Sequence, residues 1–90
     1  MQISYDPKKN RANIIKHGMS FEAAYRFDFM DCQTVIDRRK DYGETRLVST
    51  GMLDDRIHVI CYTETPDGIR AISLRKANAR ERKKYEKEKN

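Results

Sequence analysis

The chain has 90 residues, enough for one modest hydrophobic core, so we expect a single domain over residues 1–90. Its composition, 38% hydrophobic and 37% charged, is polar but too patterned for a disordered protein, and no apolar run approaches the ~20 residues of a membrane span. The formal net charge of +5 favours a polyanionic partner, and Cys32 and Cys61, which fit no metal-ligand spacing and follow no signal peptide, indicate reduced thiols in the cytoplasm.

The N-terminal third of the chain predicts a short strand and two helices. Residues 3–5 alternate in the manner of a strand. Asp6, which precedes a proline, is a good N-cap, and Gly18 is a C-terminal signal, so the segment between them is predicted to be a helix. Ser20 is a second N-cap, and the apolar residues that follow it on one helical face predict a second helix that ends at about residue 29.

Four further strands are predicted downstream, where β-branched residues become frequent. Short turn-prone clusters separate the last three strands, which should therefore form an antiparallel meander. The two N-terminal helices are available to cover one face of the sheet. We therefore expect an α+β fold, with an antiparallel β-sheet that carries two N-terminal helices on one face and is followed by a C-terminal helix. The predicted strands are residues 33–37, 45–52, 56–63 and 68–74.

Regular alternation divides the last predicted strand into two faces. One face of the strand carries Ile69, Ala71 and Ser73, and the other carries Arg70, Ile72 and Leu74. Arg75 follows directly behind the strand, before the C-terminal helix begins.

The C-terminal segment SLRKANARERKKYEKEK, residues 73–89, carries the whole net positive charge of the chain. Asn78 is expected to cap a helix there, and Glu81, three residues later, completes a capping box. Arg80 and Lys84 share one helical face, and a guanidinium can bind phosphate oxygens through two hydrogen bonds. A solvated basic helix and a phosphate-binding surface both fit this pattern.

Two histidines are candidates for proton transfer, because their ordinary pKa lies near neutral pH. His58 lies within a predicted strand, which favours a structural role. His17 lies at the end of the first predicted helix, where it could serve in catalysis or have no role. Neither has a second histidine at metal-ligand spacing, and the sequence contains no carboxylate pair or glycine-rich phosphate loop. We therefore expect no metal and no other cofactor.

Two segments of the chain contain ordered sets of short motifs: YDPKKNRANIIKHGMSFEAA, residues 5–24, and RAISLRKANARERKKYE, residues 70–86. Together they resemble the two signature regions of BrnT-type toxins, which are ribonucleases of type II toxin–antitoxin pairs with a fold similar to RelE. Leu74 stands where a small alanine is usual in that family, and we expect this difference to affect packing and not activity.

The resemblance implies a metal-independent endoribonuclease that cleaves mRNA, inhibits translation and uses the 2′-OH of the RNA as its nucleophile. It also implies neutralisation by a BrnA-type ribbon-helix-helix antitoxin in a 2:2 heterotetramer, with operator DNA bound only through the antitoxin. Arg75, Arg80 and Arg82 are candidates for cations at the phosphorane, and Tyr85, His17 and Glu81 are candidates for proton transfer. The predicted catalytic residues are thus Arg75, Arg80, Tyr85, Glu81 and His17, and the predicted RNA-binding residues are Lys76, Arg82, Lys84 and Arg70.

Two other interpretations of the basic segment remain open. The chain could be a non-catalytic nucleic-acid-binding module in which the same residues only hold backbone phosphates. It could also be a protein-interaction subunit that meets an acidic partner. New 5′-hydroxyl ends on RNA would appear only if the chain cleaves, so product analysis separates the three interpretations.

Overall fold

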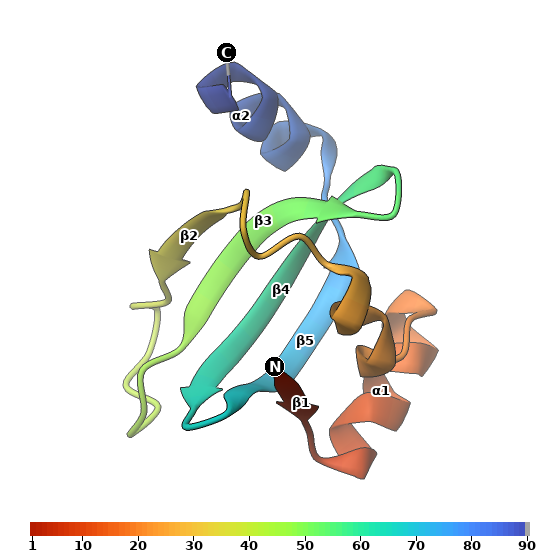
Figure 1. Ribbon diagram of the computed structural model, residues 1–90, viewed down its shortest axis with the longest axis vertical. Coiled ribbons are helices and arrows are strands. Elements are labelled where there is room, and N and C mark those ends of the chain that lie inside the picture. Colours follow the sequence, from red (N-terminus) through yellow and green to blue (C-terminus); the bar gives the residue numbers. More distant parts are fainter. Residues whose placement is uncertain (90) are drawn as a thin grey trace.

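The computed structural model describes residues 1–89, which form a five-stranded sheet, an N-terminal α-helix, a short 3₁₀ helix and a C-terminal α-helix (Figure 1). The strands lie in the order β1-β5-β4-β3-β2. The elements are β1 (Gln2–Ser4), α1 (Pro7–His17), η1 (Phe21–Arg26), β2 (Gln33–Ile36), β3 (Leu47–Leu53), β4 (Arg56–Thr65), β5 (Gly68–Lys76) and α2 (Ala79–Lys89).

Both predicted caps of α1 are confirmed. The Asp6 carboxylate accepts a hydrogen bond from the Lys8 N–H at 2.9 Å, which satisfies one of the free donors at the start of the helix. Gly18 adopts a left-handed conformation with φ 71°, and its N–H donates to the Ile14 carbonyl at 2.8 Å. The helix therefore ends at a position that is set by a residue without a Cβ.

The second predicted helix is wrong in both length and type, because the structure has only the six-residue 3₁₀ helix η1 there. The Ser20 hydroxyl accepts from the Glu22 N–H at 3.2 Å, as an N-cap does. At Phe27, however, the chain is already extended, with φ −72° and ψ 136°, and this residue forms a bridge with Leu53 of β3. A helix that continued to residue 29 would prevent this pairing, so tertiary contact overrides the helical pattern.

The predicted meander is confirmed, since β3, β4 and β5 are antiparallel neighbours and β2 is antiparallel to β3. The sheet as a whole is nevertheless mixed and not antiparallel as predicted, because β1 is parallel to β5. Gly68 makes this pairing possible: a Cβ at that residue would lie 1.9 Å from the carbonyl oxygen of Gln2. The predicted pair of N-terminal helices is thus corrected to one α-helix and a 3₁₀ segment beside a mixed sheet.

A β-bulge in β5 contradicts the regular alternation predicted for that strand. Ala71 pairs with Tyr62 and Ser73 pairs with Cys61, so Ile72 is an extra residue opposite two consecutive residues of β4. Beyond the bulge, the faces are exchanged. Leu74 therefore joins Ile69 and Ala71 in the core that packs against η1, where it is fully buried, whereas Ser73 and Arg75 point to the other face.

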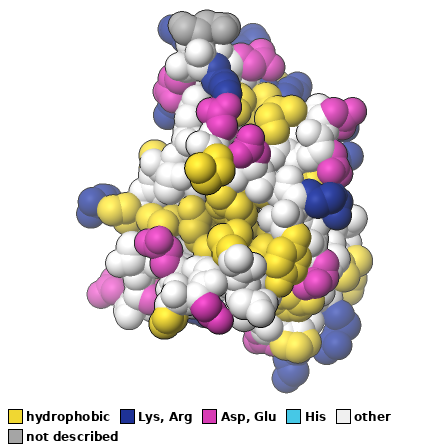
Figure 2. All heavy atoms as spheres, viewed as in Figure 1, with side chains coloured by type: hydrophobic (Ala, Val, Ile, Leu, Met, Phe, Trp, Pro, Cys, Tyr) yellow, Lys and Arg dark blue, Asp and Glu magenta, His cyan; other side chains and the backbone are white. Residues whose placement is uncertain are grey.

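The two faces of the sheet are covered to different extents. Phe21 and Ile60 are fully buried in the main core, on the face that η1 covers, whereas α1 lies along the edge of β5, where Asn13 bonds to the backbone of Leu74. Figure 2 shows hydrophobic side chains gathered at the centre of the side seen there, with Lys and Arg near its rim. On the opposite face, a smaller cluster packs below α2, which lies beyond one end of the strands (Figure 1). That smaller cluster consists of Ile57, Val59, Ala77 and Tyr85.

Candidate active site

A cavity of about 500 Å³ lies on the sheet face opposite the main core. Val48 of β3 and Val59 and Cys61 of β4 contribute apolar surface to it, because these residues alternate with those that point into the main core. Burial, followed by the nearby charge of Asp37, raises the pKa of the Cys61 thiol, so this cysteine is a neutral part of the lining. Charged residues from α1, β5, α2 and the segment after β2 also line the cavity.

Arg75 and Glu81 form a two-bonded ion pair at the cavity. Arg75 Nη1 donates to Glu81 Oε1 at 2.8 Å, and Nη2 donates to Oε2 at 2.9 Å. The predicted capping box is confirmed at the same carboxylate, which accepts from the Asn78 N–H at 2.9 Å while the Asn78 side chain accepts from the Glu81 N–H at 2.8 Å. The hydrogen bonds from Arg75 lower the pKa of Glu81, so this side chain is ionised at neutral pH and holds the guanidinium in place.

The ion pair leaves one edge of the Arg75 guanidinium available. Its contact with Glu81 uses Nη1 and one N–H of Nη2, and Nη1 also donates to the Lys76 carbonyl at 3.3 Å. Among the hydrogen bonds within residues 1–89, none involves Nε. The Nε and second Nη2 hydrogens together form a fork that fits two oxygens of a phosphate.

His17 is the last residue of α1, and it lines the same cavity together with Lys16. Partial burial, then the charge of Lys16 and then that of Arg75, lowers the pKa of the imidazole. His17 is therefore neutral at pH 7 and can accept a proton. Its location beside a guanidinium and an ammonium places a base within a cationic environment.

Asn13 holds α1 against β5 and so positions its C-terminal end. The short strand β1 pairs with β5 only at residues 68–70, so the outer edge of β5 is open beyond them. The buried Asn13 side chain fills this gap: its amide donates to the Leu74 carbonyl at 2.8 Å, and its oxygen accepts from the Leu74 N–H at 3.1 Å. It also donates to the Met19 carbonyl at 2.9 Å, which fixes the turn after the helix. The asparagine thereby acts as a one-residue extension of β1, because it bonds to the edge of β5 as another residue of that strand would.

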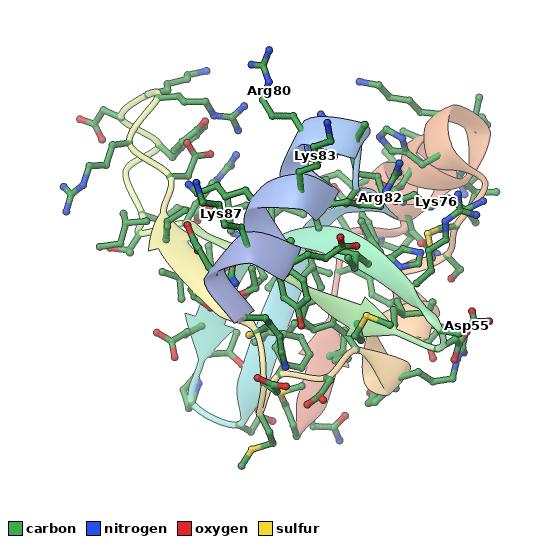
Figure 3. The ribbon with its side chains drawn as sticks, turned by 90° about the horizontal axis from the view of Figure 1, so that it is seen from above. Asp55, Lys76, Arg80, Arg82, Lys83 and Lys87 are labelled. Atoms are coloured by element: carbon green, nitrogen blue, oxygen red, sulfur yellow. The ribbon has the colours of Figure 1, made fainter. Side chains whose placement is uncertain are left out.

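The structure places the other predicted residues of α2 outside the cavity. Tyr85 is 4% exposed, belongs to the cluster beneath α2 and donates a hydrogen bond from its hydroxyl to the Asp31 carbonyl at 3.4 Å. Arg80 extends away from the rest of the molecule, whereas Arg82 and Lys87 lie on different sides of the helix (Figure 3). The basic side chains of α2 are therefore spread around the helix and do not converge on one point.

The predicted RNA-binding residues also lie apart from one another. Lys84 lines a second hollow between α2 and β2, Arg70 donates to Glu44 at 2.7 Å, and Arg82 donates to the Ala77 carbonyl at 3.2 Å. Lys76 is exposed at the end of β5. None of these four side chains lines the cavity.

Four charged residues of the cavity were absent from the predicted site: Lys16, Asp37, Arg38 and Arg39. Lys16 is part of the Lys-His-Gly motif and could have been found from its position beside His17. Asp37 is the last residue of the predicted strand 33–37, and Arg38 and Arg39 lie in the polar segment that follows it, so no local signal marks them. His58, in contrast, is buried and its Nδ1 lies 2.9 Å from the Arg56 carbonyl, in agreement with the structural role expected for it.

Two further observations bear on cofactors and membranes. No three His, Cys, Asp or Glu side chains within residues 1–89 are grouped in a way that could hold a metal ion. No helix in that part of the chain is both long and apolar enough to cross a membrane. Cys32 and Cys61 are free thiols, as predicted.

The fold and the cavity together define a small basic α+β protein with an open site in which guanidinium, ammonium and imidazole groups converge, a combination suited to a phosphodiester ligand. The chain belongs to the BrnT family, because the model of the ribonuclease toxin BrnT of type II toxin–antitoxin systems matches residues 5–81. A comparison with individual curated proteins finds no match. Membership assigns the chain to the ribonuclease toxins and implies a cognate antitoxin. The matched range includes Lys16, His17, Arg75 and Glu81 but stops before Lys84 and Tyr85.

Proposed function

We propose that the chain is a metal-independent endoribonuclease toxin that cleaves mRNA in the cavity and thereby inhibits translation. One observation carries the proposal: the two segments with the family motifs meet there, and Lys16 and His17 of the first line the same cavity as Arg75 and Glu81 of the second. Residues about 60 positions apart in sequence thus supply a base and two cations to one open surface.

Binding of the scissile phosphate is assigned to Arg75 and Lys16. The fork of Nε and Nη2 on Arg75 donates two hydrogen bonds to phosphate oxygens, while Glu81 holds the opposite edge of the guanidinium. Lys16 adds a second positive charge beside the phosphate. Negative charge increases on the phosphoryl oxygens as the pentavalent phosphorane forms, so cations that are already oriented stabilise the transition state more than the ground state.

Proton transfer from the nucleophile is assigned to His17. Its neutral imidazole takes the proton of the 2′-OH, and the 2′ oxygen attacks phosphorus as the bond to the 5′ oxygen breaks. The 5′ oxygen leaves with a proton from water, which reaches the open cavity. The products are a 2′,3′-cyclic phosphate and a new 5′-hydroxyl end, without any need for a metal-bound water.

Of the five catalytic residues predicted from the sequence, the proposal thus retains His17 and Arg75 in contact with the substrate and Glu81 as a positioning residue. Tyr85 and Arg80 are assigned to packing and to the exposed side of α2, respectively. Lys84, Arg70, Lys76 and Arg82 stay proposed contacts for RNA outside the cavity.

The experiment that tests the proposal is cleavage of RNA by the purified protein, with detection of 5′-hydroxyl ends. Arg75→Ala should lower kcat by about 10²–10³-fold, the scale for loss of one oriented donor, and His17→Ala by about 10²–10⁴-fold. Arg26→Ala is the matched control, because Arg26 pairs with Asp54 at 2.9 Å but does not line the cavity. RNA that is bound without new ends would assign the chain to the non-catalytic nucleic-acid-binding modules instead.

The partner proposed for the cavity face is a BrnA-type ribbon-helix-helix antitoxin in a 2:2 heterotetramer, with operator DNA bound only through the antitoxin. The net charge of +5 supports an antitoxin segment that is acidic and folds onto the toxin. We also propose that the chain forms a single RelE-like toxin domain and that it acts in the cytoplasm. Growth arrest that persists when the neighbouring gene is co-expressed would contradict the pairing.

A further inference from the structure

Arg39 and Asp37 form a charged unit on the side of the cavity that is formed by the segment after β2. Arg75 lies on the other side, on β5, and β5 and β2 are separated in the sheet by β4 and β3. Three strand spacings amount to about 14 Å. The two arginines therefore approach the cavity from different strands of the sheet. The hydrogen bond with Glu81 raises the pKa of Arg75, and the positive charge of Arg39 acts in the opposite direction.

The Asp37 carboxylate is fully occupied by hydrogen bonds from Arg39 and Tyr42. Its Oδ1 accepts from the Arg39 N–H at 3.1 Å and from Arg39 Nε at 2.9 Å. Its Oδ2 accepts from Arg39 Nη2 at 2.8 Å and from the Tyr42 hydroxyl at 3.2 Å. These four hydrogen bonds match the four acceptor positions of a carboxylate, and those from Arg39 hold the pKa of Asp37 well below its ordinary value, so Asp37 is ionised and directed to donors of the protein.

The two side chains of this ion pair differ in exposure, and the arginine is the exposed partner. The Asp37 side chain is 2% exposed, whereas the Arg39 side chain is 79% exposed. By comparison, Arg26 and Asp54 of the remote ion pair are 58% and 55% exposed. A buried carboxylate loses hydration, so an ion pair that buries only the acid adds little to stability. It does, however, hold the exposed guanidinium in one orientation.

Arg39 and Arg75 present opposite edges of their guanidinium groups. Arg39 uses the edge of Nε and Nη2 for Asp37, and within the described part of the chain Nη1 makes no hydrogen bond. Its available fork is therefore the Nη1 and Nη2 edge, whereas that of Arg75 is the Nε and Nη2 edge. Each fork matches two oxygens of one phosphate.

We propose that Arg39 binds a second phosphate of the bound RNA strand, distinct from the scissile phosphate at Arg75, and that Asp37 and Tyr42 are its positioning residues. This inference rests on the proposed function and adds a subsite to it. A single-stranded RNA that crosses the floor of Val48, Val59 and Cys61 has its backbone held on both sides of the cavity. The contact acts equally on the ground state and the transition state, so it contributes to binding and not to the rate of the chemical step.

The experiment has a cleavage arm and a binding arm. In the cleavage arm, Arg39→Ala should raise KM about tenfold and change kcat by less than about threefold, and Arg39→Lys should restore part of the loss because the charge returns without the fork. In the binding arm, the probe is a fully 2′-O-methylated single-stranded oligoribonucleotide, which has no nucleophile. Arg39→Ala should reduce the slope of log K against log salt by about 0.7, the change for one phosphate contact on a single strand.

Positioning by Asp37 is tested with Asp37→Asn alone and in combination with Arg39→Ala. The single variant should raise KM, and the double variant should be no worse than Arg39→Ala, because both substitutions remove the same contact. Arg26→Ala, which removes a similar arginine outside the cavity, should leave KM and the salt slope unchanged.

The two proposals fail in different ways. Wild-type protein that binds the probe but never cleaves RNA contradicts the proposed nuclease, and a reduced salt slope for Arg39→Ala would still support the Arg39 phosphate contact. Wild-type protein that cleaves RNA while Arg39→Ala retains its KM and salt slope overturns the subsite alone. Absence of any binding to the probe overturns the subsite as well.

Discussion

Glu81 shows how one carboxylate can serve a helix and a cavity at once. It closes the capping box of α2 with Asn78 and also holds the Arg75 guanidinium at 2.8 and 2.9 Å. The two roles require different chemistry, because a neutral amide can accept from the Asn78 N–H but cannot balance the charge of an arginine. A substitution to glutamine therefore separates them.

We expect Glu81→Gln to keep the free energy of unfolding within about 0.5 kcal/mol of wild type, because Gln also completes a capping box. Cleavage should fall roughly tenfold, since Arg75 loses the charged partner that orients it. Glu81→Ala should lower both the cleavage rate and the free energy of unfolding, the latter by about 1 kcal/mol. Urea unfolding and cleavage rates measured on the same preparations check this, and full activity of Glu81→Gln would reduce Glu81 to a helix cap.

The pH dependence of cleavage should follow the lowered pKa of His17. The proposed base is active when neutral, so activity is lost as pH falls through its pKa, and that midpoint should lie below the ordinary histidine value of about 6.5. Lys16→Ala should move the midpoint upward, because it removes one of the charges that disfavour the imidazolium. The profile of kcat/KM against pH measures this shift. Lys8→Ala, an exposed charge elsewhere on α1, should leave the midpoint unchanged.

At the scale of elements, the position of α1 depends on one buried amide. The side chain of Asn13 satisfies the N–H and carbonyl of Leu74 on the part of β5 that β1 does not reach. Because α1 ends at His17, this contact also determines where the proposed base lies relative to Arg75.

Asn13→Ala should reduce the free energy of unfolding by about 2–4 kcal/mol, because it leaves buried backbone groups of β5 without partners. Arg11→Ala, at an exposed position of the same helix, should change it by less than about 0.5 kcal/mol. Urea denaturation of the two variants provides the comparison. Equal stability of both would mean that water replaces the asparagine and that α1 is held mainly by apolar contacts.

At the scale of the whole molecule, the open sheet face combines cations and a base, and residues 1–89 contain no cluster of metal-ligating side chains. We therefore expect cleavage of RNA to persist in excess EDTA, with kcat within about twofold of that in buffer alone, because the proposed steps use only side chains of the protein and water. A cleavage assay before and after dialysis against chelator tests this. Loss of activity that a single divalent ion restores would show that a metal takes part.

Local signals in the sequence determined the elements whose chemistry is local. The caps of α1, the capping box at Asn78 and Glu81, and the meander of β3, β4 and β5 were all predicted, because each depends on residues within a few positions of one another. The family was also evident from motifs in residues 5–24 and 70–86.

Long-range contacts decided the rest. The bulge at Ile72 turns Arg75 toward the cavity and Leu74 into the core, and alternation in one strand cannot reveal it because it depends on the partner strand. The same holds for the bridge between Phe27 and Leu53, which ends η1 early. The burial of Tyr85 and the presence of Arg39 in the cavity also arise only when segments distant in sequence pack together, since burial is a property of the assembled sheet and helices and not of any single segment.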